Sequence, residues 1–306
     1  MKKIVMILVA VTMATFSYGQ EAPKDTTYWK KKTELGFNFN QGSFSDSWQG
    51  GGVSSYALGA LFNAKSEYLK DRDNWVNDFQ SQFGMQKIKG QEFRKSLDRL
   101  FFDSKYGRRL GSETSKWYFF AEFNVLTQFG NGHDYNYAFD NGIYPKTSAF
   151  FTPLYLTEAI GIEWKPVKYF NVSFAPGAVR QTILGDKNLY KELDRLNALQ
   201  STDTQYEFKN YGVTRGKAVQ TDVALMQLVL NFDKDLVKNV NLKWRYQGFM
   251  KLRDLAAIDN RLDVTFTAKI YKYFTFNFNL IGMYYQDQVD RIQLAQTMGI
   301  GFLHTF

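Results

Sequence analysis

Apolar and polar residues alternate over many short stretches of this chain. Between Arg261 and Ile270, every even position is apolar and every odd position is polar or charged. A period of two over this length predicts a β-strand with one apolar face and one polar face. Residues 274–280 repeat the pattern, with phenylalanine at most of the apolar positions.

The same pattern recurs roughly twelve times, and each repeat is about as long as a strand that crosses a membrane. The connections alternate in length. Short ones lie at residues 70–73, 110–115, 166–168, 233–238 and 271–273, and the longest of the others are 130–153 and 185–215. Outer-membrane barrels pair short periplasmic turns with long surface loops. We therefore predict an all-β fold, an antiparallel up-and-down transmembrane β-barrel of about twelve strands with both termini in the periplasm.

The N-terminus has the composition of a secretory signal. Lys2 and Lys3 precede a short apolar stretch, and Ser17 and Gly19 supply the small residues of a cleavage site. We predict a signal peptide at residues 1–19, a periplasmic tail at 20–32 and the barrel at 33–306. The chain contains no cysteine, which excludes disulfides, thiolate metal sites and attachment through a lipoprotein cysteine.

The overall composition also fits a barrel in a bacterial outer membrane. Aromatic residues make up 17% of the chain, although the mean hydropathy is −0.37. After the signal, no apolar run is long enough for a transmembrane helix. The formal net charge of +8 falls to +6 without the two signal lysines, and no basic run with interleaved aromatics predicts nucleic-acid binding.

Charges of both signs occupy the polar parity of the strands and are expected to face the barrel interior. The basic members are Lys65, Arg99, Lys105, Arg109, Lys243, Arg245, Arg261 and Lys269, and the acidic members are Glu34, Glu67, Asp78, Asp103, Glu122, Glu163 and Asp263. Side chains can largely fill a barrel of this size, so we favour a structural network of ion pairs. A narrow polar pore is the alternative, although a selective pore more often carries one sign of charge.

Several positions outside this network are candidates for contact with a partner. The loop from Gly42 to Gly52 combines aromatics with consecutive glycines, and it is either a plain hairpin connection or an anchor into the lumen or a partner. Glu158 shares the outward parity of Ile160, which implies a local bulge, a position at the membrane interface or a contact with another protein. The candidate contact residues are Phe44, Trp48, Gln49, Gly50, Gly51, Gly52, His133 and Glu158.

Residues 188–199 carry leucines at helical spacing and predict a short amphipathic surface helix, which could form a lid over the barrel. The chain has two histidines, His133 in a loop turn beside Asp134 and His304 on the outward parity. Neither lies beside a serine in a way that predicts a nucleophilic hydrolase. No phosphate loop, metal motif or cofactor motif is evident, so we expect no cofactor and no enzymatic activity.

The C-terminal stretch, residues 301–306, is a strand with aromatic residues at Phe302 and Phe306. It is similar to the signal by which the barrel assembly machinery recognises its precursors. Together with the signal peptide and the alternation, it favours integration into the outer membrane.

The opening of the barrel resembles a known family. The stretch from Phe39 to Gly52, which reads FNQGSFSDSWQGGG, and the following residues 57–60 are similar to the opening motif of a Bacteroidota outer-membrane barrel family that carries only a domain-of-unknown-function label. The resemblance extends over nearly the whole mature chain. It implies a barrel and an outer-membrane location, and it assigns no catalytic residues.

Three functional hypotheses follow. The first is a structural or accessory subunit of a larger envelope assembly for protein insertion, secretion or uptake. The second is a narrow passive channel for ions or small polar solutes, and the third is a surface hydrolase. Outer-membrane lipid or lipopolysaccharide, the barrel assembly machinery and other outer-membrane or periplasmic proteins are the expected partners.

Overall fold

The computed structural model describes residues 27–42, 54–201 and 205–305. The predicted signal peptide, the loop candidates Phe44, Trp48, Gln49, Gly50, Gly51 and Gly52, and the C-terminal Phe306 lie outside the described residues.

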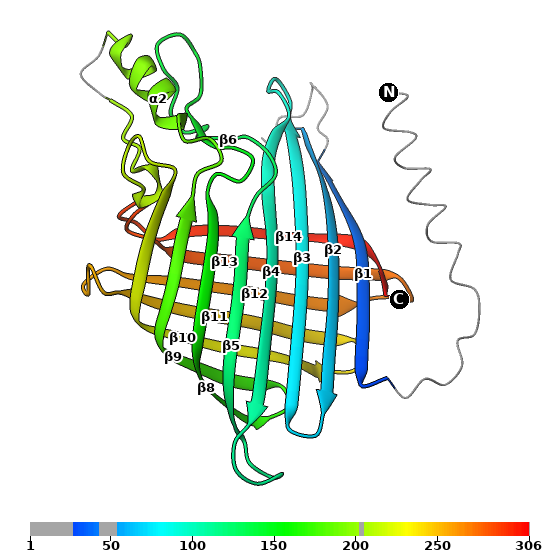
Figure 1. The fold of residues 1–306 in the computed structure, drawn as a ribbon. Coiled ribbons are helices and arrows are strands. Elements are labelled where there is room, and N and C mark those ends of the chain that lie inside the picture. The colour runs from blue at the N-terminus through cyan, green and yellow to red at the C-terminus, as the bar shows by residue number, and fades with distance from the viewer. Residues whose placement is uncertain (1–26, 43–53, 202–204, 306) are drawn as a thin grey trace.

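Twelve long strands form one closed antiparallel barrel, which confirms the predicted fold class and strand number. Each strand pairs with its neighbours along the chain, and the first strand pairs with the last (Figure 1). The strands are β1 (Trp29–Gly42), β2 (Ser55–Lys70), β3 (Asp73–Ile88), β4 (Arg94–Arg109), β5 (Trp117–Thr127), β8 (Leu154–Val167), β9 (Phe170–Ile183), β10 (Val219–Val237), β11 (Val240–Lys251), β12 (Ile258–Lys269), β13 (Phe274–Tyr284) and β14 (Gln293–Thr305). The pairing of the first and last strands closes the sheet, so that each of the other strands has a backbone partner on both sides.

The two ends of the barrel differ, as the connection lengths predict. One end, called here the short-turn end, carries the start of β1, the end of β14 and the turns after β2, β4, β8, β10 and β12. β1 begins at Trp29, inside the predicted tail. β10 continues to Val237, so its connection to β11 is the tight turn Lys238–Asn239, in which Asn239 adopts a positive φ of 69°.

The opposite end, the long-loop end, carries the remaining elements. The loop between β5 and β8 contains β6 (Gly132–His133) and β7 (Lys146–Ser148), which form a small two-stranded sheet. The loop between β9 and β10 contains α2 (Leu189–Ala198) and the short 3-10 helix η1 (Asn210–Gly212). Figure 1 shows both loops rising together at one side of the barrel mouth, and α2 stands among them at that side and not across the mouth.

The outward face of the barrel is apolar, and its aromatic residues are sorted along the barrel axis. Every tryptophan within the described residues lies near the short-turn end of its strand. These are Trp29, Trp75, Trp117, Trp164 and Trp244. Trp75 donates its indole N–H to the hydroxyl of Ser104 at 2.9 Å. A belt of this kind marks the level at which a barrel meets the membrane–water interface.

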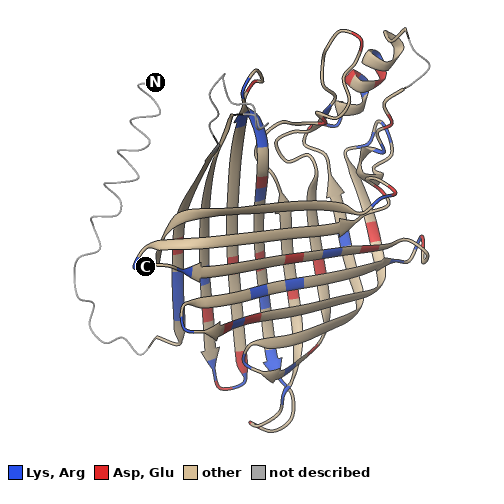
Figure 2. Ribbon diagram, turned by 180° about the vertical axis from the view of Figure 1, so that it is seen from behind, with Lys and Arg blue, Asp and Glu red and all other residues tan. Residues whose placement is uncertain are grey.

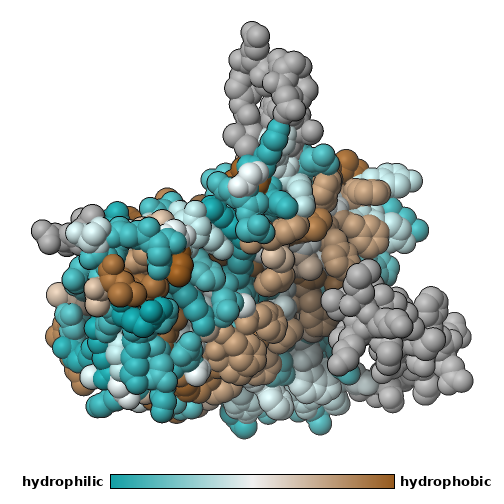
Figure 3. All heavy atoms as spheres, turned by 90° about the horizontal axis from the view of Figure 1, so that it is seen from above, coloured by the Kyte–Doolittle hydropathy of each residue, from teal (hydrophilic) through white to brown (hydrophobic). Residues whose placement is uncertain are grey.

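Viewed from the long-loop end, hydrophilic residues cover much of the raised loops, and hydrophobic residues gather on the flank of the barrel beside them (Figure 3). A closed barrel with an apolar outer surface and an aromatic belt is the architecture of an outer-membrane protein. Among the described residues, no helix is both long and apolar enough to cross a membrane.

The pairing of β3 with β4 shifts register between Gly84 and Met85, and bulges in the neighbouring strands β9 and β10 also break the alternation. Ile160 and Ile162 of β8 pair with Gly177 and Phe174 of β9. Because two residues of β9 lie opposite one residue of β8, β9 carries an extra residue around Pro176. In β10, the register against β11 shifts between Ala224 and Met226. Counting by twos from Met226 and Leu228 predicts that Ala224 faces lipid, and this prediction is wrong. The inserted residue turns Ala224 inward, where only 2% of its surface is exposed.

Candidate functional site

The interior of the barrel holds buried charges, and several residues of the predicted network are among them. Arg245 on β11 reaches Glu122 on β5 at 3.2 Å, and it also donates to the amide oxygen of Asn231 at 3.2 Å. Lys105 on β4 contacts Glu163 on β8 at 2.6 Å. Glu122 and Glu163 are almost completely buried, so each carboxylate depends on its cation for solvation.

Other members of the predicted network form smaller groups. The guanidinium of Arg261 binds both carboxylate oxygens of Asp263 at 2.8 Å. Lys243 on β11 approaches Asp78 on β3 at 3.8 Å. Since β3 and β11 lie on opposite sides of the strand order, this contact spans the lumen. Figure 2 shows acidic and basic residues interspersed over the strands of the barrel wall.

Most of the remaining residues of the predicted charge network contact partners on the same strand or on a neighbouring strand. Lys65 pairs with Glu67 at 2.5 Å, and Glu34 pairs with Lys32 at 2.7 Å, both along one strand. Arg99 donates to the amide oxygen of Gln80 at 2.7 Å, Asp103 accepts from Asn124 at 3.1 Å, and Arg109 donates to the hydroxyl of Tyr118 at 3.0 Å. Lys269 is exposed at the end of β12.

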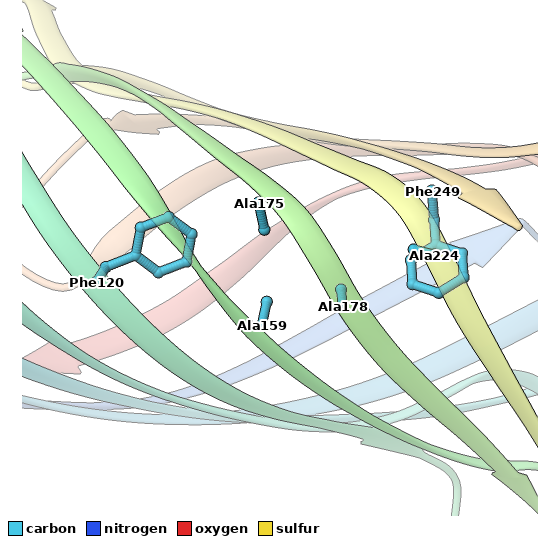
Figure 4. Packing of buried hydrophobic residues seen from close by; sticks show 6 residues of the cluster. All are labelled: Phe120, Ala159, Ala175, Ala178, Ala224 and Phe249. Atoms are coloured by element: carbon cyan, nitrogen blue, oxygen red, sulfur yellow. The ribbon is translucent and has the colours of Figure 1, made fainter. Parts of the chain in front are cut away.

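An apolar cluster fills part of the interior and was not anticipated from the sequence. We call it the apolar plug. It consists of Phe120, Ala159, Ala175, Ala178, Ala224 and Phe249. Figure 4 shows the alanines of β8 and β9 lying between the two phenylalanine rings. Phe120 and Phe249 are only 1% and 0% exposed. The alternation in β5 and β11 predicts that both phenylalanines point inward. However, apolar residues were not expected at the inward positions, which are mostly polar.

A second group of charges lies nearer the long-loop end, and we call it the long-loop ion cluster. It contains Asp222, Asp259 and Asp287 together with Arg180, Lys251 and Arg253. Arg180 binds Asp259 at 2.7 Å, and its guanidinium lies 3.8 Å from the ring centroid of Phe249. The cluster thus continues directly from the apolar plug.

Only some residues of this cluster could be predicted from the sequence to face the barrel interior. Lys251 and Asp259 continue the inward parity of β11 and β12 and could have been included. Arg180 and Asp222 lie beyond the bulges in β9 and β10, so counting by twos from the rest of each strand places them on the wrong face. Asp287 comes from the loop between β13 and β14, which no periodicity describes.

The raised loops form a folded unit that we call the loop platform, comprising residues 130–153, 185–201 and 205–215. Its core consists of Phe139, Leu193 and Leu196, with Tyr137, Tyr206 and Phe208 packed against it. The amide of Asn197 donates to the carbonyl of Tyr206 at 2.9 Å and accepts from its N–H at 2.8 Å. The predicted amphipathic helix is confirmed as α2, and its buried leucines supply this core.

Polar contacts fix the parts of the loop platform to one another. The carboxylate of Asp140 accepts hydrogen bonds from the N–H and the hydroxyl of Ser201 at 2.6 and 2.7 Å, and these bonds lower the pKa of Asp140. Burial, followed by the nearby carboxylate of Asp134, raises the pKa of Tyr206. Lys209 reaches Asp290 of the β13–β14 loop at 2.6 Å, which ties the platform to the far side of the barrel mouth.

His133 lies in β6 and pairs with Lys146 of β7, so it belongs to a small sheet and not to a loop tip. Partial burial, and then the positive charges of Lys146 and Lys95, lower the pKa of its imidazole. The neighbouring carboxylate of Asp134 accepts hydrogen bonds from the Tyr206 hydroxyl at 3.3 Å and from the N–H of Asn136 at 3.0 Å. Through these hydrogen bonds Asp134 stabilises the fold of the loop platform; they do not orient the imidazole of His133.

The two other candidate positions lie on the outer surface. Glu158 is exposed on the outward face of β8, opposite Phe123 of β5 and Val179 of β9. The bulge in the β8–β9 pair lies beyond it, toward Ile162, and does not turn Glu158 inward. Phe302 is also outward, opposite Phe37 of β1.

Comparison with solved structures finds bacterial barrels of low sequence identity. The translocator domain of autotransporter NalP from Neisseria meningitidis is 6% identical, with 98% of this chain and 95% of that chain covered and a TM-score of 0.32. A porin refined at 1.8 Å resolution is 8% identical, with 90% and 100% covered and a TM-score of 0.32. The CymD monoaromatic hydrocarbon channel is 9% identical, with 90% and 88% covered and a TM-score of 0.33.

Comparison with curated protein sequences found no significant match. One family model, described as "Protein of unknown function (DUF3078)", matches residues 39–133, from within β1 to β6. This match confirms the predicted resemblance to a domain-of-unknown-function family, over a shorter part of the chain than expected. Residues 39–133 thus match the DUF3078 family of unknown function, within a barrel of the outer-membrane type.

Proposed function

We propose that this protein is a non-conducting outer-membrane barrel that serves as a structural, accessory subunit of a larger envelope assembly. The observation that carries the proposal is the set of buried contacts on the inner side of β4, β5 and β8 to β11. A pore needs a continuous aqueous path, whereas here the apolar plug and the Glu122–Arg245 and Lys105–Glu163 pairs are buried inside the barrel wall.

The balance of charge supports the same reading. Within the long-loop ion cluster, three carboxylates face three cations. Deeper in the barrel, Glu122 contacts Arg245, and Glu163 contacts both Lys105 and Lys165. Ion-selective pores carry rings of one sign. A charge network that satisfies itself has little free capacity to attract a permeating ion.

The loop platform is the part suited to a partner. It has its own core and several polar contacts, so it presents a preformed surface that loses little conformational freedom on binding. Ile143 and Leu199 are exposed apolar residues of this platform, and a bound partner would remove their apolar surface from water. On this proposal the platform is extracellular and the short-turn end is periplasmic, as in bacterial barrels in general. Glu158 and the outward aromatic residues then face outer-membrane lipid or a neighbouring protein.

The test has two parts. Tagged protein is solubilised from its native outer membrane in mild detergent, and co-purifying proteins are identified by mass spectrometry and by size. We expect a stoichiometric partner, retained by a Glu207→Gln control and lost in a Leu199→Glu variant that places a charge on the platform surface. Purification of the wild-type protein as a lone monomer would refute the accessory role.

The second part addresses the channel alternative. The purified barrel is inserted into planar bilayers, and single-channel currents are recorded over a range of voltages. We expect no discrete conductance steps from the wild-type protein. A Phe120→Ala, Phe249→Ala double variant removes both rings of the apolar plug and should produce steps. Steps in the wild-type protein would favour a passive channel.

A further inference from the structure

The barrel closes along an incomplete seam. β1 pairs with β2 over its whole length, from Trp29 to Gly42, but its paired register with β14 covers only Glu34 to Asn38. Beyond Asn38, toward the long-loop end, β14 continues to pair with β13 alone. Figure 1 shows β1 running lengthwise while β14 crosses the back of the barrel, so the two strands diverge.

At this point a side-chain hydrogen bond takes the place of backbone pairing between β1 and β14. The amide of Asn40 donates to the carbonyl oxygen of Met298 at 3.2 Å. The opposing Gly299 leaves room for this amide, because a Cβ atom there would lie 2.7 Å from the Asn40 nitrogen. Gly59 does the same for Asn38, since a Cβ atom there would lie 2.1 Å from its amide oxygen. Beside the seam, the side chains of Asn38 and Asn40 therefore pack directly on glycines.

An apolar groove lies on the lipid-facing side of the seam. It has a volume of about 570 Å³ and crosses β14, β1, β2 and β3. Its lining includes Phe37, Phe39, Leu58, Phe83, Met85 and Ile300. This volume falls in the range of small-molecule sites, about 300–1,000 Å³, and its position makes the bilayer the source of whatever fills it.

A small pocket of mixed polarity lies against the same wall. It has a volume of about 80 Å³, and its polar lining consists of uncharged side chains, mainly Asn38, Asn40, Asn277, Asn279, Gln82 and Thr297. The groove and the pocket share Asn38, Gly59 and Phe83 among their lining residues. None of the residues that line either cavity carries a charge.

We infer that the β1–β14 seam binds a membrane amphiphile, with one acyl chain in the groove and a small, uncharged, hydrogen-bonding group at the asparagine pocket. The groove supplies apolar surface for the chain, and the amides supply both donors and acceptors for hydroxyl or ester groups. A charged headgroup is disfavoured, because burying it without a counter-ion costs its hydration. The size of the pocket limits the polar group to a few heavy atoms.

The experiment uses the full-length barrel in lipid nanodiscs and a monoacylglycerol probe that carries a photoreactive diazirine at the end of its chain. After irradiation, labelled peptides are mapped by mass spectrometry. We expect labelling of β1, β2 and β14 to exceed that of the lipid-facing residues of β11 and β12 by at least about fivefold, as for a site preferred by roughly 1 kcal/mol. Equal labelling around the whole barrel would mean ordinary boundary lipid and would overturn the inference.

Two variants separate the parts of the site. Ala60→Trp fills the groove and should reduce seam labelling to the level of β11 and β12. Ala121→Trp, at another outward alanine on β5, should leave it unchanged. If Ala60→Trp has no effect, the groove does not bind the chain.

Asn40→Leu tests the polar pocket by comparison with an alkane probe of the same length. The wild-type seam should prefer the monoacylglycerol over the alkane, and the variant should label equally with both. A preserved preference in Asn40→Leu, or equal labelling of the wild-type protein by a charged fatty-acid probe, would refute the assignment of the polar group. Heat-dependent gel mobility confirms that each variant is folded.

Discussion

The Glu122–Arg245 pair offers a direct test of whether the interior is dry and self-satisfied. The perturbation is a double-mutant cycle of Arg245→Met, Glu122→Gln and the combination. In the native barrel, the Glu122 side chain is 2% exposed and that of Arg245 is 16% exposed, at a separation of 3.2 Å. Neither group can therefore exchange its partner for bulk water.

The expected magnitudes follow from this burial. Arg245→Met leaves Glu122 buried without its cation and should lower the free energy of unfolding by about 3–5 kcal/mol. Glu122→Gln should cost about 1–3 kcal/mol, since Arg245 keeps the Asn231 amide as an acceptor. The double variant removes both charges together and should cost less than the sum, with a coupling of about 2–3 kcal/mol.

The assay is equilibrium urea unfolding in lipid vesicles, followed by the fluorescence of the tryptophan belt. Arg108→Met is the matched control, because Arg108 forms an exposed pair with Asp73 at 3.5 Å and should cost no more than about 1 kcal/mol. Additive effects within about 0.5 kcal/mol would refute the reasoning. They would mean that Glu122 and Arg245 are separately hydrated in a water-filled lumen.

Three further predictions concern the wall and the loop platform. Gly161→Ala should destabilise the barrel by about 1–3 kcal/mol, because the added Cβ atom would lie 2.1 Å from a backbone oxygen of β9. The control is Gly177→Ala at the same bulge, where the added Cβ atom has open space. It should leave the free energy of unfolding nearly unchanged in the same urea titration. Phe139→Ala should increase proteolysis of the loop platform and leave the heat-dependent gel mobility of the barrel unchanged. The Asp140–Ser201 contact, which lowers the pKa of Asp140, should hold above the ordinary carboxyl pKa and be lost as pH falls through the lowered value. Hydrogen exchange at Ser201, corrected for its intrinsic pH dependence, should accelerate on acidification in the wild-type protein and not in Asp140→Asn.

The alternation of side chains was sufficient to predict the barrel, the number of strands and most of the inward charges. Arg261 and Asp263 illustrate the reason. In a strand without bulges, every second residue faces the same side, so the orientation of a side chain can be deduced from its position in the sequence. The same rule failed at Ala224, because a bulge adds one residue between Ala224 and Met226 and so reverses the residues before it relative to those after it. Pro176 and Gly177 are a visible cue to the bulge in β9, whereas the bulge in β10 has no comparable cue.

The contacts on which the proposed function and the seam proposal rest could not be predicted from periodicity. Glu122 and Arg245 were both assigned inward, but their pairing depends on how the closed barrel brings β5 and β11 together. The loop platform depends on contacts between two loops far apart in the sequence, such as Asp140 with Ser201. The seam depends on where β1 and β14 stop pairing, which follows from the curvature of the whole sheet and not from either strand alone.

Because β1 and β14 are the first and last strands, their pairing also sets the order of biogenesis. No other pair can substitute for it, so the barrel remains an open sheet until the last thirteen-residue strand has been delivered. Such a sheet exposes two unpaired edges, each a template for aggregation. A ring completed through only a few backbone pairs, Glu34 to Asn38 against Gly301 to Thr305, gains little from that last contact alone. Until β14 pairs with β1, the sheet therefore remains open to pairing with other chains.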